Sequence, residues 1–217
     1  TTEIYTLSLH DALPIWVGLG LSHIEQYWFY GDRTDRRREL ARAALEQAAE
    51  LAPDLPEVDY AMGVFYYHGY LDYDRALERL RRAVTADPGH AEFHEWIGYV
   101  LRRAGRLDEA IASLERAAQL DPGSSRVVSG LGETYVVAGR YREAQIPLDR
   151  AMDLSPTDWS TRSMATWSAV AQGDATGAGA RARDAIVRIG VPSILINRPD
   201  LLRQWVRLLP PADRRLL

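Results

Sequence analysis

The chain repeats itself with a period of about 34 residues, and this period constrains the fold more than any other feature of the sequence. Pro53, Pro88, Pro122 and Pro156 lie 35, 34 and 34 residues apart. Each follows a stretch with small and apolar residues at helical spacing, and a proline disfavours the helical conformation for the residue before it. A fixed period of this length is the signature of supersecondary units that bury their apolar faces against their neighbours. We therefore expect an array of stacked units.

The clearest unit spans residues 91–122, AEFHEWIGYVLRRAGRLDEAIASLERAAQLDP. Two segments of helical periodicity are separated there at Gly105, which predicts a helical hairpin. A shift of 34 or 35 residues brings other small residues onto the same frame. These are Gly63, Gly98 and Gly132 in the first helix and Ala76, Ala110 and Ala144 in the second. A glycine inside a helix costs about 1 kcal/mol relative to alanine, so its recurrence predicts the close approach of a second helix.

This pattern resembles the tetratricopeptide repeat family, in which a large residue, Leu-Gly, Tyr, Ala, Phe and Pro recur at set offsets in a 34-residue hairpin. The resemblance covers roughly residues 21–190. His94, Asp59 and Val128 stand where the family favours Trp, and Leu replaces Phe in the second helix. The resemblance implies an all-α fold, a right-handed superhelical solenoid of about five helix-turn-helix repeats.

The repeat frame also predicts the organisation of the chain. The expected units are residues 16–54, 57–88, 91–122, 125–156 and 158–190, followed by a C-terminal cap at 191–217. The unit at 158–190 is poor in large apolar residues, so its packing is expected to be loose. Within the last segment, Leu201, Leu202, Trp205, Leu208 and Leu209 form an apolar stripe that suits a helix closing the end of an array. The alternative is a docking segment for a further domain.

Residues 1–15, TTEIYTLSLHDALPI, resemble the translation of a common short-read sequencing adapter from Glu3 to Ile15. We expect this segment to be an artefact and exclude it from reasoning about the fold. On this interpretation the natural protein begins upstream of Trp16, and its true N-terminus is missing.

Composition excludes several classes of function. No run of 18 apolar residues occurs, so no membrane span is expected, and a cytoplasmic location is favoured. The net charge of -4 gives no footprint for nucleic acid. The chain has no cysteine and no lysine, which excludes thiolate catalysis, cysteine-ligated zinc, Schiff bases and phosphate loops that need a lysine.

No motif for catalysis is present. The segment around His90 and His94 lacks the His-Glu-x-x-His order of zinc proteases, and no serine has a G-x-S-x-G context. We therefore predict no catalytic residues, no metal site, no cofactor and no enzymatic activity.

A stack of hairpins offers a groove lined by the first helix of each unit. The repeat frame predicts an aromatic stripe with a basic centre on this face, and Tyr, Trp and Arg are enriched at binding hot spots. Each ring could instead complete the core between hairpins. The candidate groove residues are Tyr60, Val64, Tyr67, His68, Trp96, Tyr99, Arg102, Arg103, Arg126, Glu133 and Trp167.

The sequence thus predicts a non-catalytic scaffold that binds a protein or peptide, with no nucleic-acid or membrane partner. The segments YYHGYLDYDRAL (66–77) and RRAGRLDEA (102–110) resemble repeat regions fused behind kinase or DNA-binding domains of bacterial signalling proteins. This resemblance suggests the interaction region of a larger, N-terminally truncated bacterial regulator. The alternative is a structural spacer or a self-association module. Some family members clamp a C-terminal carboxylate with lysines and asparagines. That mode is not expected, because lysine is absent and the sole asparagine is Asn197.

Overall fold

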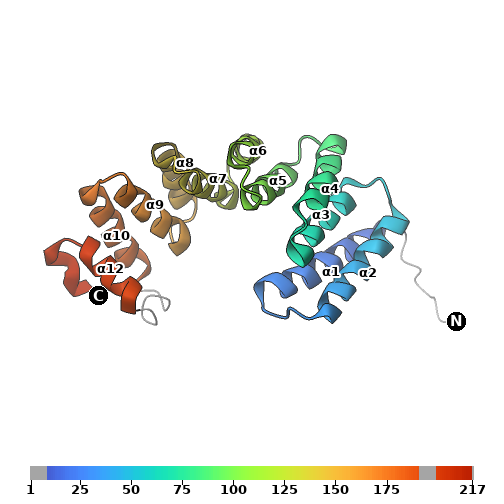
Figure 1. Ribbon diagram of the computed structural model, residues 1–217, viewed down its shortest axis with the longest axis horizontal. Helices are drawn as coiled ribbons and strands as arrows, with labels where there is room; N and C mark the ends of the chain where they lie inside the picture. The colour runs from blue at the N-terminus through green and yellow to red at the C-terminus, as the bar shows by residue number, and fades with distance from the viewer. Residues whose placement is uncertain (1–8, 191–198, 217) are drawn as a thin grey trace. The chain divides into compact units, whose positions relative to one another are not determined.

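The computed structural model describes residues 9–190 and 199–216, and all regular structure in those ranges is helical (Figure 1). Eleven α-helices and one short 3-10 helix follow one another along the described residues. The predicted all-α class is therefore confirmed. Residues 1–8 of the adapter-like segment and the link at 191–198 lie outside the described residues.

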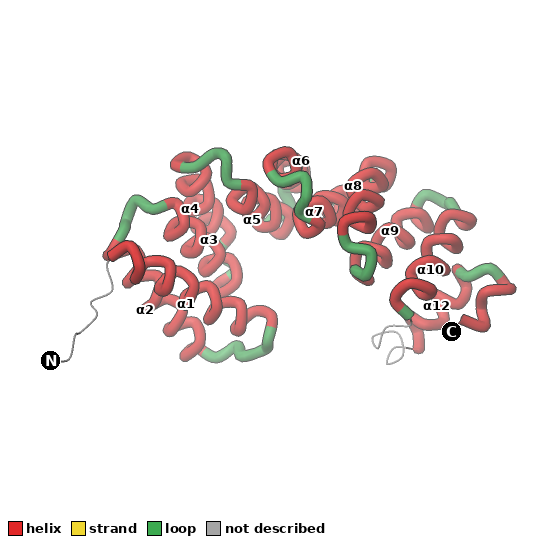
Figure 2. The backbone as a smooth tube through the Cα atoms, turned by 180° about the vertical axis from the view of Figure 1, so that it is seen from behind, coloured by secondary structure: helices red, strands yellow, loops and turns green. Residues whose placement is uncertain are grey.

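The helices follow one another as pairs joined by short loops (Figure 2). The pairs are α1 (Leu9–Phe29) with α2 (Asp35–Leu51), α3 (Pro56–Tyr70) with α4 (Tyr73–Ala86), α5 (Ala91–Arg103) with α6 (Leu107–Leu120), α7 (Ser125–Val137) with α8 (Tyr141–Leu154), and α9 (Trp159–Ala171) with α10 (Ala175–Ile189). Helix α12 (Pro199–Leu208) and the 3-10 helix η1 (Pro211–Leu216) end the chain. Helix α1 starts before the expected Trp16 and so includes part of the adapter-like segment.

The chain divides into two compact units, residues 1–113 and 114–217, with the boundary inside α6. In unit 1, α3 packs against its hairpin partner α4 and also against the first helices α1 and α5. In unit 2, α7 packs on α8 and α9 on α10, and α12 packs on α10.

Left-handed residues end the first helix of each hairpin at corresponding positions. Gly105, Gly139 and Gly173 have φ of 77°, 72° and 76° and lie 34 residues apart. Glycine adopts this conformation without steric cost, which explains why it recurs at helix C-termini. The α3–α4 turn places Leu71 there instead, with φ of 54°. A non-glycine residue is disfavoured in the left-handed region. The left-handed backbone at Leu71 shows that the repeat period predicts the backbone conformation even where the residue is not glycine.

At Gly63 and Gly132, the second helix of the hairpin comes close to the first, as the sequence predicts. A Cβ added at Gly63 would lie 2.6 Å from Leu80 Cγ, and one at Gly132 would lie 2.7 Å from Leu148 Cδ2. Leu80 and Leu148 are fully buried in the second helices of their hairpins. The missing side chain therefore makes room for a leucine of the partner helix.

We expect Gly63→Ala to destabilise the protein, even though alanine favours a helix by about 1 kcal/mol. The added Cβ must displace Leu80, and overpacking of this kind typically costs about 1 to 3 kcal/mol. The matched control is Gly18→Ala in α1, where an added Cβ meets nothing within 4 Å. Urea unfolding should show Gly18→Ala to be neutral or stabilising. Equal stabilisation by both substitutions would contradict the packing role of Gly63.

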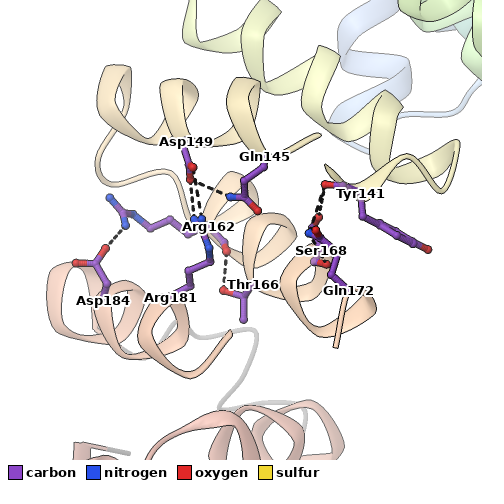
Figure 3. Close-up of polar contacts among 9 residues, drawn as sticks. All are labelled: Tyr141, Gln145, Asp149, Arg162, Thr166, Ser168, Gln172, Arg181 and Asp184. Carbon is purple, nitrogen blue, oxygen red and sulfur yellow. Dashed lines mark hydrogen bonds and ion pairs between the residues drawn. The ribbon is translucent and has the colours of Figure 1, made fainter. Parts of the chain in front are cut away.

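Polar contacts join the last hairpin of unit 2 to the helix before it (Figure 3). Asp149 of α8 accepts hydrogen bonds from Gln145 at 3.1 Å and from Arg181 of α10 at 2.7 Å. The hydroxyl of Ser168 and the amide of Gln172, both near the end of α9, donate to the Tyr141 carbonyl at 3.3 and 3.4 Å. These bonds connect helices that have few large apolar side chains to bury against each other.

Arg162 is the buried cation of this hairpin. Its Nε donates to the Pro156 carbonyl at 2.7 Å. Its Nη1 pairs with Asp184 of α10 (Figure 3). Thr166 in turn donates to the Arg162 carbonyl at 2.8 Å. A buried guanidinium is costly unless it is paired and hydrogen-bonded, and both conditions are met here. We assign Arg162 a role in joining α9 to α10.

Helix α12 covers the end of unit 2 with an apolar face. Its Trp205 packs on Trp159 and Trp167 of α9, with ring centroids 4.7 and 6.2 Å apart. The surrounding core consists of Ala182, Ala185, Ile186 and Leu209. The predicted apolar stripe of this helix therefore faces the last hairpin.

Candidate functional site

An aromatic cluster lies where the first helices of three hairpins meet in unit 1. Helix α3 contacts both α1 and α5, which brings side chains from three segments of the chain together. On α3, the spacing of Tyr60, Val64, Tyr67 and His68 places all four on one helical face. We define the aromatic cluster as Trp28 and Phe29 of α1, Tyr60, Tyr67 and His68 of α3, and Trp96 and Tyr99 of α5.

His68 lies at the centre of the aromatic cluster and is only 3 % exposed. Its ring stacks on Trp28 with centroids 4.7 Å apart and planes 9° from parallel. The ring of Trp96 meets it edge-on at 5.2 Å, and the ring of Phe29 does so at 5.5 Å. Such stacked and edge-to-face pairs are the favoured aromatic geometries, so the cluster is well ordered around the imidazole.

The buried imidazole is uncharged at neutral pH. Burial of His68, assisted by the positive charge of Arg103, lowers its pKa from the usual 6.5 to about 4. Both causes act against the charged form of histidine. The cluster therefore presents a neutral imidazole, with one ring nitrogen as donor and the other as acceptor.

Two buried polar atoms of the cluster have no hydrogen-bond partner among the described residues. They are Nδ1 of His68 and Nε1 of Trp96. A buried tryptophan N–H normally has a partner, because an unmade hydrogen bond there costs about 1 to 3 kcal/mol.

Arginines border the aromatic cluster. Arg103 is exposed and lies near the Tyr67 hydroxyl. Burial raises the pKa of Tyr67, and the positive charge of Arg103 partly offsets this rise. Arg33 lies over the Trp28 ring at 5.5 Å, and Arg102 lies over the Tyr99 ring at 5.2 Å. The site thus combines aromatic surface, unsatisfied hydrogen-bonding groups and positive charge. This is suited to recognition rather than to bond cleavage.

Comparison with protein families identifies the repeats. Two family models described as "Tetratricopeptide repeat" match residues 71–125 and 101–161. Residues 71–161 of the chain consist of tetratricopeptide repeats. Proteins of this family are generally non-catalytic scaffolds that bind proteins or peptides. No curated protein matches the chain in sequence.

Solved structures share the fold of these tetratricopeptide repeats at low sequence identity. PilF of Pseudomonas aeruginosa is 20 % identical with a TM-score of 0.72, and the match covers 95 % of this chain and 96 % of that one. MamA of Desulfovibrio magneticus is 19 % identical with a TM-score of 0.66, covering 81 % and 94 %. The TTC0263 protein of Thermus thermophilus is 22 % identical with a TM-score of 0.61, covering 94 % and 100 %. These likenesses support the repeat fold and carry no information on the partner.

The structure places the predicted residues of the second repeat in the core. Tyr60, Val64, Tyr67 and His68 are each less than a tenth exposed, which differs from the expectation that they line an open groove. The cause is the close packing of α1 and α5 on either side of α3, whose rings cover them. In the third repeat, Trp96, Tyr99 and Arg102 are half-buried and Arg103 is exposed.

The other three predicted residues lie in unit 2. On α7 of the fourth repeat, Arg126 is exposed and Glu133 is half-buried. Trp167 on α9 of the fifth repeat is half-buried and packs against Trp205 of α12. The structure therefore gives Trp167 a contact within the chain, because α12 covers part of its ring.

Sequence reasoning did not include Trp28, Phe29 and Arg33 among the site residues. The signal was present as an aromatic run, YWFYGDR, at the end of the first helix. The degenerate first repeat obscured it, because its longer linker moves these residues off the frame of the later units. Phe29 and Tyr30 are 65 % and 80 % exposed, which is unusual for large aromatic side chains.

Within residues 9–190 and 199–216, no group of three or more His, Asp or Glu side chains is placed to hold a metal ion. No helix in these ranges combines the length and apolar character needed to cross a bilayer.

Proposed function

We propose that this chain is a non-catalytic scaffold that holds a protein or peptide partner on the aromatic cluster of unit 1. The observation that carries the proposal is the partly accessible aromatic and basic surface that Trp96, Tyr99 and Arg103 form on α5. The general role of tetratricopeptide repeat proteins supports the proposal.

The cluster has the composition of a binding hot spot. Trp, Tyr and Arg are the residues most enriched at such sites, and here Trp96, Tyr99 and Arg103 are all at least partly accessible. Phe29 and Tyr30 add exposed apolar surface at the end of α1. We propose that these residues and Arg102 contact the partner, while Tyr60, Val64, Tyr67 and His68 support them from beneath.

Three finer points remain proposals. Arg126, Glu133 and Trp167 of unit 2 are further proposed partner contacts. The chain is proposed to serve as the interaction region of a larger bacterial regulator. The alternative role, a spacer or self-association module, needs no ligand on the aromatic cluster.

Trp96→Phe should weaken peptide binding about tenfold, since it reduces the accessible aromatic surface and keeps a ring in the cluster. The ligands for this measurement are peptides selected on the full chain from a phage-displayed random library. Affinity is then measured by fluorescence anisotropy, and thermal unfolding is followed by circular dichroism. The melting temperature should stay close to that of the parent protein.

Trp159→Phe, in unit 2, is the matched control and should leave affinity unchanged. Sedimentation of the free chain at several concentrations tests the alternative role. A failure to select any peptide, together with concentration-dependent association that Trp96→Phe does not change, would favour self-association and contradict the proposal.

A further inference from the structure

We propose that a surface pocket beside the start of α2 binds a phosphate monoester, whose dianionic group pairs with the guanidinium of Arg36. The pocket lies at the loop that joins α1 to α2 (Figure 2) and has a volume of about 470 Å³. We define this loop pocket by the residues that line it, which are Asp32, Thr34, Arg36, Arg37 and Leu40. None of them belongs to the aromatic cluster, so the inference goes beyond the proposed peptide binding.

The acid that lines the loop pocket is held by its neighbours and is not open to a cation. Asp32 Oδ2 accepts a hydrogen bond from Arg37 Nε at 2.7 Å, and Oδ1 accepts from the Thr34 hydroxyl at 2.9 Å. These hydrogen bonds lower the pKa of Asp32, so its carboxylate is ionised at neutral pH and balances the charge of Arg37. Asp32 therefore fixes the wall of the pocket and leaves no unpaired negative charge to repel an anion.

Arg37 is fixed from two sides. Its Nη1 lies 2.9 Å from Nδ1 of His23 on α1, and the imidazole must accept this hydrogen bond because a guanidinium only donates. Burial of His23, assisted by the positive charge of Arg37, lowers the pKa of His23, so the imidazole is neutral at neutral pH. A guanidinium carries more N–H groups than these two partners use, so Arg37 keeps donors for an anion.

Arg36 supplies positive charge that the described residues do not balance. It is exposed, and no carboxylate of those residues forms an ion pair with it. The acid next to it, Asp35, pairs instead with Arg38. Because Asp32 and Arg37 balance each other, Arg36 leaves the lining of the loop pocket with an excess of positive charge. Guanidinium groups bind phosphate oxygens in a bidentate geometry.

The first turn of α2, which carries Arg36 and Arg37, adds backbone donors. Thr34 is the N-cap of α2, and its hydroxyl oxygen accepts from the Arg37 backbone N–H at 3.2 Å. The backbone N–H groups of Asp35 and Arg36 come earlier in the helix, where an α-helix provides no acceptor of its own. Helix starts of this kind favour negative charge and bind phosphate groups. The dipole of α2 therefore favours the same ligand as the Arg36 guanidinium.

The size of the loop pocket and its apolar residue favour an ester over free phosphate. A volume of about 470 Å³ is within the range of pockets that hold small organic ligands. Leu40 is 40 % exposed and offers apolar surface to the carbon atoms of an ester. A phosphate group has three acceptor oxygens, one more than a carboxylate, so it suits donors that come from both side chains and a helix start.

The test is a titration of the isotope-labelled full chain, followed by the NMR signals of its backbone amides. The probes are glycerol 3-phosphate and a capped tripeptide with phosphoserine between two alanines, at an ionic strength kept constant with sodium chloride. We expect the amide signals of Asp35, Arg36 and Arg37 to shift until saturation, with a Kd of about 1 mM or lower. The signals of α12 should not shift.

The two probes distinguish the sources of the phosphate group. A lower Kd for glycerol 3-phosphate would identify free phosphate esters as the ligand, and a lower Kd for the tripeptide would identify a phosphorylated protein segment. Either result supports the inference, because the recognised group is the same.

Arg36→Ala should weaken the binding of both probes about tenfold, because it removes the unbalanced guanidinium. Its melting temperature should match that of the parent, since Arg36 is exposed and forms no ion pair with the described residues. Arg81→Ala is the matched control. Arg81 is exposed on α4, and its loss changes the net charge equally, so the Kd should stay unchanged.

An absence of saturable shifts with both probes would overturn the inference. Equal weakening in Arg36→Ala and Arg81→Ala would also overturn it, because the net charge and not the loop pocket would then attract the anion. Tighter binding of succinate than of either probe would overturn the assignment to phosphate. None of these results bears on the proposed function, which is tested with peptides at the aromatic cluster.

Discussion

Trp205→Ala is expected to destabilise unit 2 by about 3 to 5 kcal/mol, the usual cost of truncating a buried tryptophan. Trp205 is 2 % exposed and lies between the rings of Trp159 and Trp167 and the alanines of α10. Its removal would leave a large cavity that the short side chains around it cannot fill. The effect should be greatest in α9 and α10, which α12 covers.

The composition of α10 makes this contact important. Its buried residues are Ala178, Gly179, Ala182, Ala185 and Ile186, so the helix contributes one large apolar side chain to the core. The backbone of α12 comes close enough that a Cβ at Gly179 would lie 2.8 Å from the Leu208 carbonyl oxygen. The sequence predicted loose packing in this repeat. The structure differs, because α12 supplies the large apolar side chains that α10 lacks.

Amide hydrogen exchange is the appropriate measurement, since a chain with two units need not unfold in one step. Protection of α9 and α10 should fall in Trp205→Ala, and that of α3 should not. The protection of α9 and α10 in Trp205→Phe should lie between that in the parent and that in Trp205→Ala. Gln204→Ala changes an exposed position on α12, so its protection should match that of the parent. Unchanged protection of α10 in Trp205→Ala would contradict the capping role of α12.

The second large effect is a loss of stability at acidic pH through His68. Its pKa is about 4 in the folded chain and close to 6.5 when exposed. Between these values the unfolded chain binds a proton and the folded chain does not, so the free energy of unfolding falls as pH falls. Across the whole window the loss amounts to about 3 kcal/mol.

Urea unfolding at pH 7 and at pH 4 tests this linkage. His68→Phe keeps an aromatic ring against Trp28 but cannot titrate, so it should lose less stability than the parent between these pH values. His94→Gln is the control, because His94 is only partly buried and its Nε2 lies 3.1 Å from the Pro88 carbonyl. An equal loss in the parent and in His68→Phe would show that His68 does not cause the acid sensitivity.

Sequence reasoning predicted the repeats well, because the contacts that define a hairpin are local. The glycines at 63 and 132 and the leucines at 80 and 148 lie within one hairpin, and their spacing recurs. The turn glycines at 105, 139 and 173 follow the same period. A pattern that repeats several times in one chain provides its own internal control.

The candidate site was predicted only in part. The period correctly placed aromatic residues on the first helices, but it left open whether each ring faces a partner or the core. Burial of Tyr67 and His68 depends on Trp28 and Trp96, which come from different hairpins. Trp28 belongs to the less regular first repeat and was not among the candidate groove residues.

By itself, the sequence determined that this chain forms helical hairpins of the tetratricopeptide type, and it determined which small residues lie between their helices. Only the tertiary structure decided which aromatic faces are covered and that Trp205 completes the last repeat. The physical reason is range. Contacts within a hairpin follow from spacing along one period, whereas burial, pairing and pKa depend on side chains that other hairpins bring close.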